Sequence, residues 1–193
     1  MRKLTGLLAI SVVVLLSSFA ATDWVNFQSK EGKFTIKFPR QPVAASQKVD
    51  NEVFRIKLYT FVYDATKYKD DNEVYLTMYC DYPDTLVNSD FREEIVDTIL
   101  KGSIDGMAGN MNGTIMSIDN INYKDFPGKK VKMDLKGGQG FAYVRIYLVH
   151  NRMYMLEVLC DPKKDHNASI DKFFDSFVIT DTKASVKKPV SKH

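Results

Sequence analysis

The sequence has few of the residues that catalytic and metal sites need. Histidine occurs only at positions 150, 166 and 193, and no two histidines have the spacing of a zinc-binding helix. The nucleophile-elbow pattern Gly-x-Ser-x-Gly is absent, and the glycine-rich run 137–140 lacks the lysine and the helix of a phosphate loop. We therefore predict no catalytic residue, no metal ligand and no cofactor. A small envelope hydrolase whose site assembles only in space is the alternative.

Cysteine is equally scarce. Cys80 and Cys160 are the only two, and each comes near the end of an expected strand and is followed by aspartate. In an oxidising compartment the two thiols could form a disulfide, provided that the fold brings their Cα atoms within about 7 Å. The alternative is a pair of buried free thiols, because cysteine packs well as a small apolar side chain.

Long apolar runs are missing except at the start of the chain. A largely apolar stretch of ten residues, 7–16, follows Arg2 and Lys3. It is shorter than the roughly 20 residues that span a bilayer, so it is typical of a signal peptide rather than of a membrane anchor. The small residues Ser18 and Ala20 predict cleavage after Ala20, which makes 1–20 the signal peptide. We expect a protein that is periplasmic or secreted, without stable membrane insertion after signal removal.

Net charge is small as well. The formal charge is +3, and loss of Arg2 and Lys3 with the signal leaves +1. The tail 181–193 holds four lysines and Asp181, so the body 21–180 carries a charge of −2. A body this close to neutral argues against nucleic-acid binding. We interpret 21–180 as a single domain and 181–193 as a basic tail too poor in apolar residues to order itself.

The strongest strand pattern lies between 140 and 162. Two alternating runs meet at His150-Asn151, a pair that tolerates the positive φ of a tight hairpin turn. Both faces of this ribbon are apolar, which predicts a central hairpin covered on both sides. Further strands are predicted at 34–38, 43–49, 52–63, 73–82, 115–123 and 129–135. A turn at Phe126-Pro127-Gly128 is expected between the last two.

Two helices are expected. The first begins near Asp90, which has capping-box spacing with Glu93. Its apolar stripe consists of Phe91, Ile95, Ile99, Gly102 and Gly106. The glycines would let this stripe lie close to a sheet. The second helix is expected to begin after a cap at Asn167 and to seal one face of the sheet. Its apolar stripe consists of Ile170, Phe173, Phe174 and Phe177.

Several short motifs occur in an order that is similar to a known superfamily. They are Trp24-x-x-Phe27, the run 32–39 (GKFTIKFP), Pro127-Gly128, the run 145–148 (RIYL), the run 151–156 (NRMYML) and the run 173–177 (FFDSF). In this order the chain resembles exported bacterial proteins of the PsbP-like superfamily, which also includes a photosystem II extrinsic subunit and a Ran-binding nuclear import factor. The resemblance implies an α+β fold in which an antiparallel β-sheet has helices on both faces, an α/β/α sandwich. It implies no function, because proteins on one fold have unrelated partners.

An aromatic face is the best candidate for ligand binding. Aromatic side chains recur at alternate positions of three expected strands, with one arginine among them. The members of this face are Tyr59, Phe61, Tyr63, Tyr75, Tyr79, Tyr143, Arg145 and Tyr147. If part of the face is open, rings with polar tips suit a sugar, a peptide or a protein partner. The alternative is that a helix covers the face and the tyrosine hydroxyls reach its rim.

Four acidic residues offer a weaker site. Asp81 and Asp84 follow one cysteine-bearing strand, and Asp161 and Asp165 follow the other. If both strands end side by side, these carboxylates could hold a calcium ion, which takes about six to eight oxygen ligands. Turn-forming acids in solvated loops are the simpler interpretation. The sequence as a whole predicts a non-catalytic binding or interaction module of the envelope, with a protein or small-ligand partner.

Overall fold

The computed structural model describes residues 24–50, 53 and 55–181. The predicted signal segment 1–20, and all of the predicted tail except Asp181, lie outside the described residues. The strands are β1 (Val25–Ser29), β2 (Phe34–Phe38), β3 (Val43–Asp50), β4 (Arg55–Asp64), β5 (Val74–Asp81), β6 (Gly113–Tyr123), β7 (Phe126–Leu135), β8 (Gly140–Val149), β9 (Arg152–Cys160) and β10 (Val178–Ile179). The helices are α1 (Glu93–Met111), the short 3-10 helix η1 (Pro162–Lys164) and α2 (Ala168–Asp175).

Seven of the described strands form one antiparallel sheet in the order β3-β4-β5-β9-β8-β7-β6. The predicted hairpin is confirmed: β8 and β9 pair in the middle of this sheet, and His150 takes a φ of 53° at their turn. A second sheet has the order β1-β2-β10. In this sheet β2 pairs with β1 and with β10, which come from opposite ends of the described chain. The small sheet is therefore complete only when both ends of the described chain have folded.

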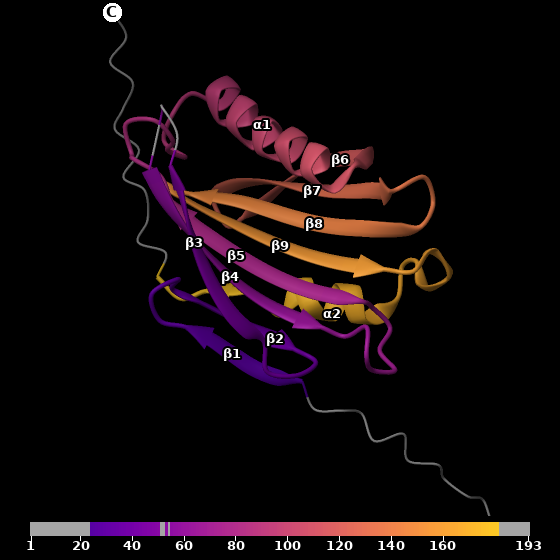
Figure 1. Cartoon of the computed structure of the whole chain (residues 1–193). Helices are drawn as coiled ribbons and strands as arrows, with labels where there is room; N and C mark the ends of the chain where they lie inside the picture. Colours follow the sequence, from indigo (N-terminus) through magenta and orange to yellow (C-terminus); the bar gives the residue numbers. More distant parts are fainter. Residues whose placement is uncertain (1–23, 51–52, 54, 182–193) are drawn as a thin grey trace, which may run out of the picture.

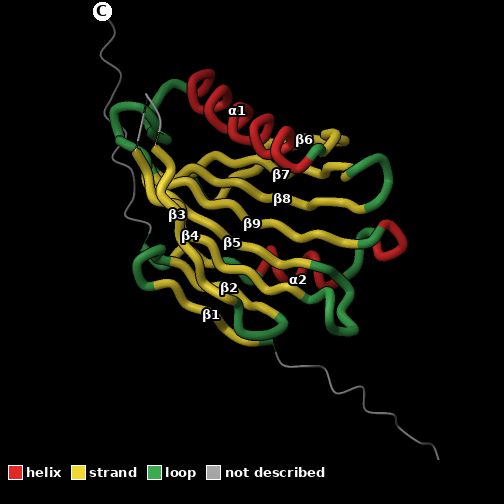
Figure 2. The backbone as a smooth tube through the Cα atoms, viewed as in Figure 1, coloured by secondary structure: helices red, strands yellow, loops and turns green. Residues whose placement is uncertain are grey.

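The two faces of the large sheet are covered differently (Figure 1 and Figure 2). α1 lies over β6, β7 and β8 on one face. The other face packs against α2 and the small sheet, which contribute Phe34, Phe173 and Phe177 to an aromatic core. The α+β class with antiparallel sheets agrees with the sequence. The expected α/β/α sandwich is not confirmed, because strands of the small sheet take much of the place of a second helix layer.

Strand β2 joins the small sheet to the large one. Its sequence FTIKF alternates, and Phe34, Ile36 and Phe38 are fully buried. The ring centroid of Phe34 lies 5.5 Å from that of Phe177 and 6.1 Å from that of Tyr154. Aromatic pairs at such separations attract one another beyond the burial of their area. These rings therefore hold the two sheets together.

Helix α2 has the predicted cap and the predicted apolar stripe. The Asn167 side-chain oxygen accepts hydrogen bonds from the backbone N–H groups of Ser169, at 3.0 Å, and Ile170, at 3.2 Å. The buried residues of the helix and its exit are Ile170, Phe173, Phe174 and Phe177. The helix therefore closes the aromatic core against the middle of the large sheet.

Helix α1 turns a different stripe toward the sheet from the one predicted. Its buried residues are Val96, Leu100, Ile104 and Ala108. Ile95 is 39% exposed, and a Cβ atom added at Gly102 or Gly106 would have no neighbour within 4 Å. The observed stripe has side chains at every position, so it buries more apolar area than a stripe with glycines would. The prediction of a capping box at Asp90 and Glu93 is also wrong, because Arg92 is the N-cap residue and its side chain makes no capping hydrogen bond.

The turn between β6 and β7 lies earlier than predicted. Lys124, with a φ of 54°, and Asp125 form the turn, and Phe126 already belongs to β7. Gly128 serves a close approach of two strands, because a Cβ atom there would lie 2.4 Å from the carbonyl oxygen of Ile146 on β8. The Pro-Gly pair therefore reflects tight strand pairing rather than a turn.

The structure excludes the disulfide. Both thiols are free and buried, Cys80 in the core beneath α1 and Cys160 in the aromatic core on the opposite face. β5 and β9 run antiparallel, and Cys80 pairs with Met153, which lies seven residues before Cys160. At about 3.3 Å per residue this separates the two cysteines by roughly 23 Å, several times the span of a disulfide.

We expect both thiols to be unreactive in the folded protein. Burial raises the pKa of Cys80 and of Cys160 to about 11, so little thiolate forms near neutral pH. Alkylation without reductant, followed by intact-mass measurement, should give no adduct under native conditions and an adduct on both cysteines in denaturant. Adducts that appear only after reduction would contradict the assignment of free thiols.

Candidate binding site

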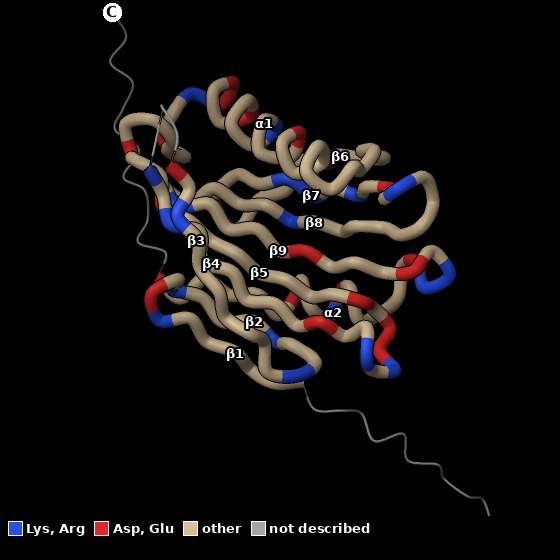
Figure 3. Tube along the Cα trace, in the orientation of Figure 1, with Lys and Arg blue, Asp and Glu red and all other residues tan. Residues whose placement is uncertain are grey.

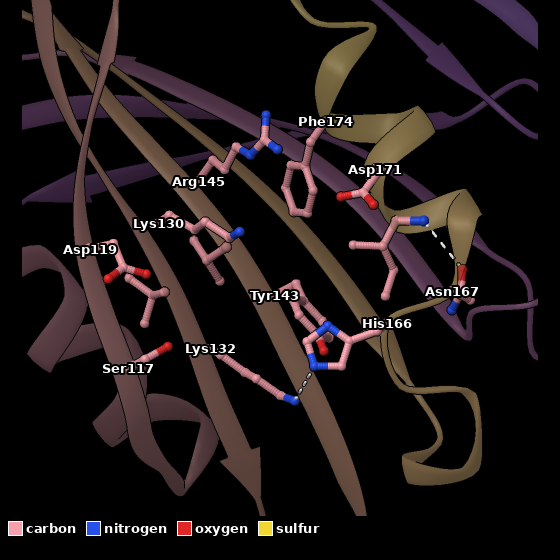
Figure 4. Close-up of a pocket in the computed structure, with 13 residues that line it drawn as sticks. Ser117, Asp119, Lys130, Lys132, Tyr143, Arg145, His166, Asn167, Asp171 and Phe174 are labelled. Carbon is pink, nitrogen blue, oxygen red and sulfur yellow. Dashed lines mark hydrogen bonds between the residues drawn. The ribbon is translucent and has the colours of Figure 1, made fainter.

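A pocket of about 260 Å³ lies on the face of the large sheet that α2 partly covers (Figure 4). Cross-strand pairing builds its floor from two rows of polar side chains. The rows, across β6, β7 and β8, are Asp119–Lys130–Arg145 and Ser117–Lys132–Tyr143. Because side chains alternate along a strand, residues two apart share a face, and both rows point to the α2 side of the sheet.

The wall of the pocket comes from α2 and the two residues before it. Ile170 and Phe174 are buried and supply the apolar part of the wall, and Asp171 stands beside them on the exposed side of the helix. His166, with a φ of 55°, and the cap residue Asn167 close one end. The cap that starts α2 therefore also fixes the wall of the pocket against the sheet.

One end of the pocket is a hydrogen-bonded network around Asp165. The Lys132 ammonium donates to both carboxylate oxygens of Asp165, at 2.9 and 2.7 Å, and the Tyr143 hydroxyl donates to the same carboxylate. His166 Nε2 lies 3.4 Å from Lys132 Nζ. Burial opposes ionisation of Asp165, but the bonds from Lys132 and Tyr143 outweigh burial and lower the pKa of Asp165. This end is therefore charged and held in place at neutral pH.

Arg145 is fixed at the other end of the floor. Its Nη1 lies 2.9 Å from Asp175 Oδ1, and its Cζ lies 4.9 Å from the ring centroid of Phe174. The Asp175 side chain is 67% exposed, so water weakens this ion pair. Stacking on Phe174 then does much to orient the guanidinium. Arg145 is thus positioned while its charge is only partly balanced.

Three charged side chains that line the pocket have no ion pair among the described residues. They are Asp119, Lys130 and Asp171. Lys130 lies on the sheet and Asp171 on α2, so a cation and a carboxylate lie on opposite sides of the hollow (Figure 4). The pocket therefore offers charges of both signs to a ligand.

The pocket lacks an activated nucleophile. Within the described part of the chain, the Ser117 hydroxyl makes no hydrogen bond, and His166 lies beside the Lys132 ammonium instead. A serine hydroxyl without an adjacent base is a weak nucleophile.

The predicted aromatic face is largely core. Five of its members, Tyr63, Tyr75, Tyr79, Tyr143 and Tyr147, are buried, and Tyr59 and Phe61 are half-buried against them. The small sheet and α2 cover it, since rings such as those of Phe34 and Phe173 pack on it. An open aromatic binding face is therefore corrected to a buried one, and Tyr143 and Arg145 alone among its members line the pocket described here.

The predicted acidic cluster does not form. Because β5 and β9 are antiparallel, Asp81 lies at one end of the strand pair and Asp161 at the other. Asp81 pairs with Arg152, and Asp165 pairs with Lys132. Asp84 follows β5 and so lies near Asp81 in the chain. Among the described residues no group of His, Cys, Asp and Glu is placed to hold a metal ion.

A second hollow, of about 230 Å³, lies beside the loop that precedes β5 and is lined by acids. Three of its four carboxylates, those of Asp70, Asp71 and Asp161, have hydrogen-bond partners within the fold. The Tyr75 hydroxyl donates to Asp70 at 2.7 Å, and the Ser169 hydroxyl donates to Asp71 at 2.7 Å. These bonds tie the loop to the start of α2, so we assign the hollow a structural role.

Five polar pocket residues, Ser117, Asp119, Lys130, Lys132 and Asp171, were missed from the sequence. The alternation of lysines along β7 could have located the floor, since pairing with β8 places Lys130 beside Arg145 and Lys132 beside Tyr143. Asp171 has no comparable signal, because its position depends on how α2 docks on the sheet.

Comparison with known proteins bears on the fold. No family model matches the chain, and no curated protein matches it. Among solved structures, the chain is similar to the solution structure of cyanobacterial PsbP (CyanoP) from Synechocystis sp. PCC 6803. The TM-score is 0.52 and the sequence identity 8%, over 84% of this chain and 95% of that one. The fold is PsbP-like.

The PsbP-like resemblance drawn from short motifs is thus confirmed at the level of fold. An identity of 8% transfers neither a site nor a partner. A relation to exported bacterial proteins, or to a Ran-binding factor, stays a prediction. In the part of the chain that the structure describes, neither helix has the length and apolarity that crossing a membrane requires.

Proposed function

We propose that the protein is a non-catalytic binding module of the cell envelope and that the pocket between α2 and β6, β7 and β8 is its ligand site. The observation that carries the proposal is the pair Lys130 and Asp171, unpaired charges of opposite sign on the floor and on the α2 wall of the pocket. Around them, Lys132 and Arg145 are already held by Asp165 and by Asp175 with Phe174, respectively. A pre-organised frame that presents unpaired charges of both signs, with Asp119 beside Lys130 on the floor, suits the binding of a charged ligand.

The ligand that suits these walls carries both a carboxylate and an ammonium group. The carboxylate would face Lys130 and the ammonium Asp171. The volume of about 260 Å³ lies just below the roughly 300 Å³ at which pockets for drug-sized ligands begin. We therefore assign the site to a free amino acid or a short peptide.

The test uses one dipeptide, alanyl-alanine, in free, N-acetylated and C-amidated form, with affinities measured by calorimetry. We expect the free dipeptide to bind about two- to fivefold more tightly than either blocked form, because an exposed ion pair contributes up to about 1 kcal/mol. With Lys130→Ala, the C-amidated dipeptide should bind as tightly as the free one, whereas the N-acetylated form should still bind more weakly. With Asp171→Asn, the N-acetylated dipeptide should bind as tightly as the free one, whereas the C-amidated form should still bind more weakly.

Lys37→Ala is the matched control, because Lys37 is exposed on β2 and does not line the pocket. Its affinities should equal those of the wild type. Equal binding of all three dipeptides, or affinities that neither pocket variant changes, would contradict the proposed site. Cleavage of the dipeptide during the titration would instead support the hydrolase alternative.

The cellular location of the module is part of the same proposal. The segment 1–20 is proposed to direct export and to be removed, which leaves the domain 21–180 and the basic tail 181–193. Intact-mass measurement on protein from its native host should give a chain that begins at Ala21 or within a residue or two of it. Retention of Met1, or a lipid adduct, would contradict it.

A further inference from the structure

The large sheet is only half covered on its α1 side. α1 lies over β6, β7 and β8, whereas no helix of the described chain is drawn over β9, β5 and β4 on that face (Figure 1). The apolar residues there are half-buried: Leu58, Leu76, Met78, Met155 and Leu159. Their strand neighbours on the opposite face, such as Tyr75 and Leu156, are fully buried. We refer to these five residues as the half-covered face.

One flank of α1 borders this half-covered face. Asp97 contacts Lys129 of β7, which also bonds Asn120 of β6, so that flank of the helix looks toward β6. At about 100° per residue, Ile99 projects from the opposite flank, toward β9. Gly106 lies on the same flank, and a Cβ atom there would have no neighbour within 4 Å. Ser103 lies on this side of the helix as well, so the flank carries small and apolar residues and leaves open space beside Gly106.

Glu157 lies on β9, at the border between the half-covered face and the strands beneath α1. Its cross-strand neighbours are Leu76 and Val144, and Met155 and Leu159 flank it along β9. The residue is 7% exposed, and no described residue gives it a hydrogen bond or an ion pair. Burial alone raises the pKa of Glu157 to about 7. In Figure 3 the acidic position of β9 lies beside an uncharged stretch of β5.

The dimensions of this face match one helix. Strands lie about 4.8 Å apart, so the three strands β9, β5 and β4 span roughly 10 Å from the first axis to the last, and a helix with its side chains is about 10–12 Å across. Gly106 on the neighbouring flank allows a second helix to approach α1 closely. A buried carboxylate without a partner is unfavourable, and a cation delivered to it removes that penalty.

We propose that the half-covered face binds an amphipathic helix of a partner protein, whose apolar side packs on Met78, Met155 and Leu159 and which places one lysine or arginine at Glu157. The buried carboxyl of Glu157, which has no partner among the described residues, favours this occupant over a purely apolar one, because a nearby cation stabilises the ionised form. A lipid chain would leave the Glu157 carboxyl without a counter-charge.

The probe is a synthetic amphipathic helix of about 15 residues, long enough for about four turns, with one lysine in its apolar side. Its partner peptide has norleucine in place of that lysine. Fluorescence anisotropy should show that the lysine peptide binds at least about tenfold more tightly. Glu157→Gln should abolish this preference, and the norleucine peptide should then bind at least as tightly, because the buried ammonium no longer has a counter-charge.

A steric variant tests the place of binding. Gly106→Leu has room to fold, and it should weaken the binding of the lysine peptide because the new side chain fills the flank. Lys101→Leu is the control, since it places the same side chain about 140° around the helix. Equal binding of both peptides to the wild type, no binding at millimolar concentration, or self-association of the protein that Gly106→Leu abolishes would each overturn the proposal.

Discussion

Phe177→Ala should lower the free energy of unfolding by about 3–5 kcal/mol, which is the usual cost of removing a buried aromatic ring. The ring is 5% exposed and contacts the rings of Phe34, Tyr147 and Tyr154. It lies where the exit of α2, the small sheet and the large sheet meet. Thermal melts should show a midpoint about 6–20 °C lower than that of the wild type.

Val178→Ala is the matched control for this loss. Val178 is the next residue, is 48% exposed and pairs with Thr35 in the same small sheet. Its truncation should change the stability by less than about 1 kcal/mol, as is usual at exposed positions. Similar melting points for the two variants would mean that α2 and the small sheet do not pack on the large one.

Glu157 should make the protein less stable as the pH rises. Burial raises its pKa from 4.5 to about 7, so the folded state holds a proton between these values that the unfolded state has released. Stability falls with pH wherever the folded state binds more protons. A difference of this size corresponds to about 3 kcal/mol, present in full below pH 4.5 and lost by a pH somewhat above 7.

The measurement is chemical denaturation of the wild type and Glu157→Gln from pH 4 to pH 9. Other carboxyl groups, such as Asp165 with its lowered pKa, contribute equally to the pH dependence of stability in both proteins. The difference between the two stability curves therefore isolates the contribution of Glu157. That difference should move in favour of the variant by about 3 kcal/mol across the range. Glu94→Gln, on the exposed side of α1, should run parallel to the wild type. Parallel curves for Glu157→Gln would show that its carboxyl is not buried.

The elements with strong local signals were predictable. The hairpin of β8 and β9 follows from alternation on both faces and from a turn that places His150 at positive φ. The start of α2 follows from Asn167, whose short side chain caps the helix. In both cases the information lies within a few residues of the structure it determines.

Features that depend on pairing distant segments were not predictable. α1 has two apolar stripes, and only packing shows that Leu100 rather than Ile99 lies deepest against the sheet. The small sheet pairs β2 with β10, which are far apart in the sequence. The aromatic face could not be recognised as core until that sheet was known to cover it.

The binding pocket was predictable only in part. Its floor follows from strand alternation, which places Lys130 beside Arg145 once β7 and β8 are paired. Its wall depends on the docking of α2, which brings Asp171 and His166 over the same strands. The calcium and disulfide hypotheses failed for a single reason. Both required β5 and β9 to end on the same side, and these strands are antiparallel.

The most direct test of the central claim is to titrate the protein with alanyl-alanine while following its backbone amide resonances by NMR. If the pocket is a binding site, the shifted amides should cluster on β6, β7, β8 and the start of α2, around Lys130, His166 and Asp171. The dipeptide signals should stay intact throughout. Shifts that are absent or lie elsewhere, or the appearance of free alanine, would contradict a non-catalytic binding module that uses this pocket.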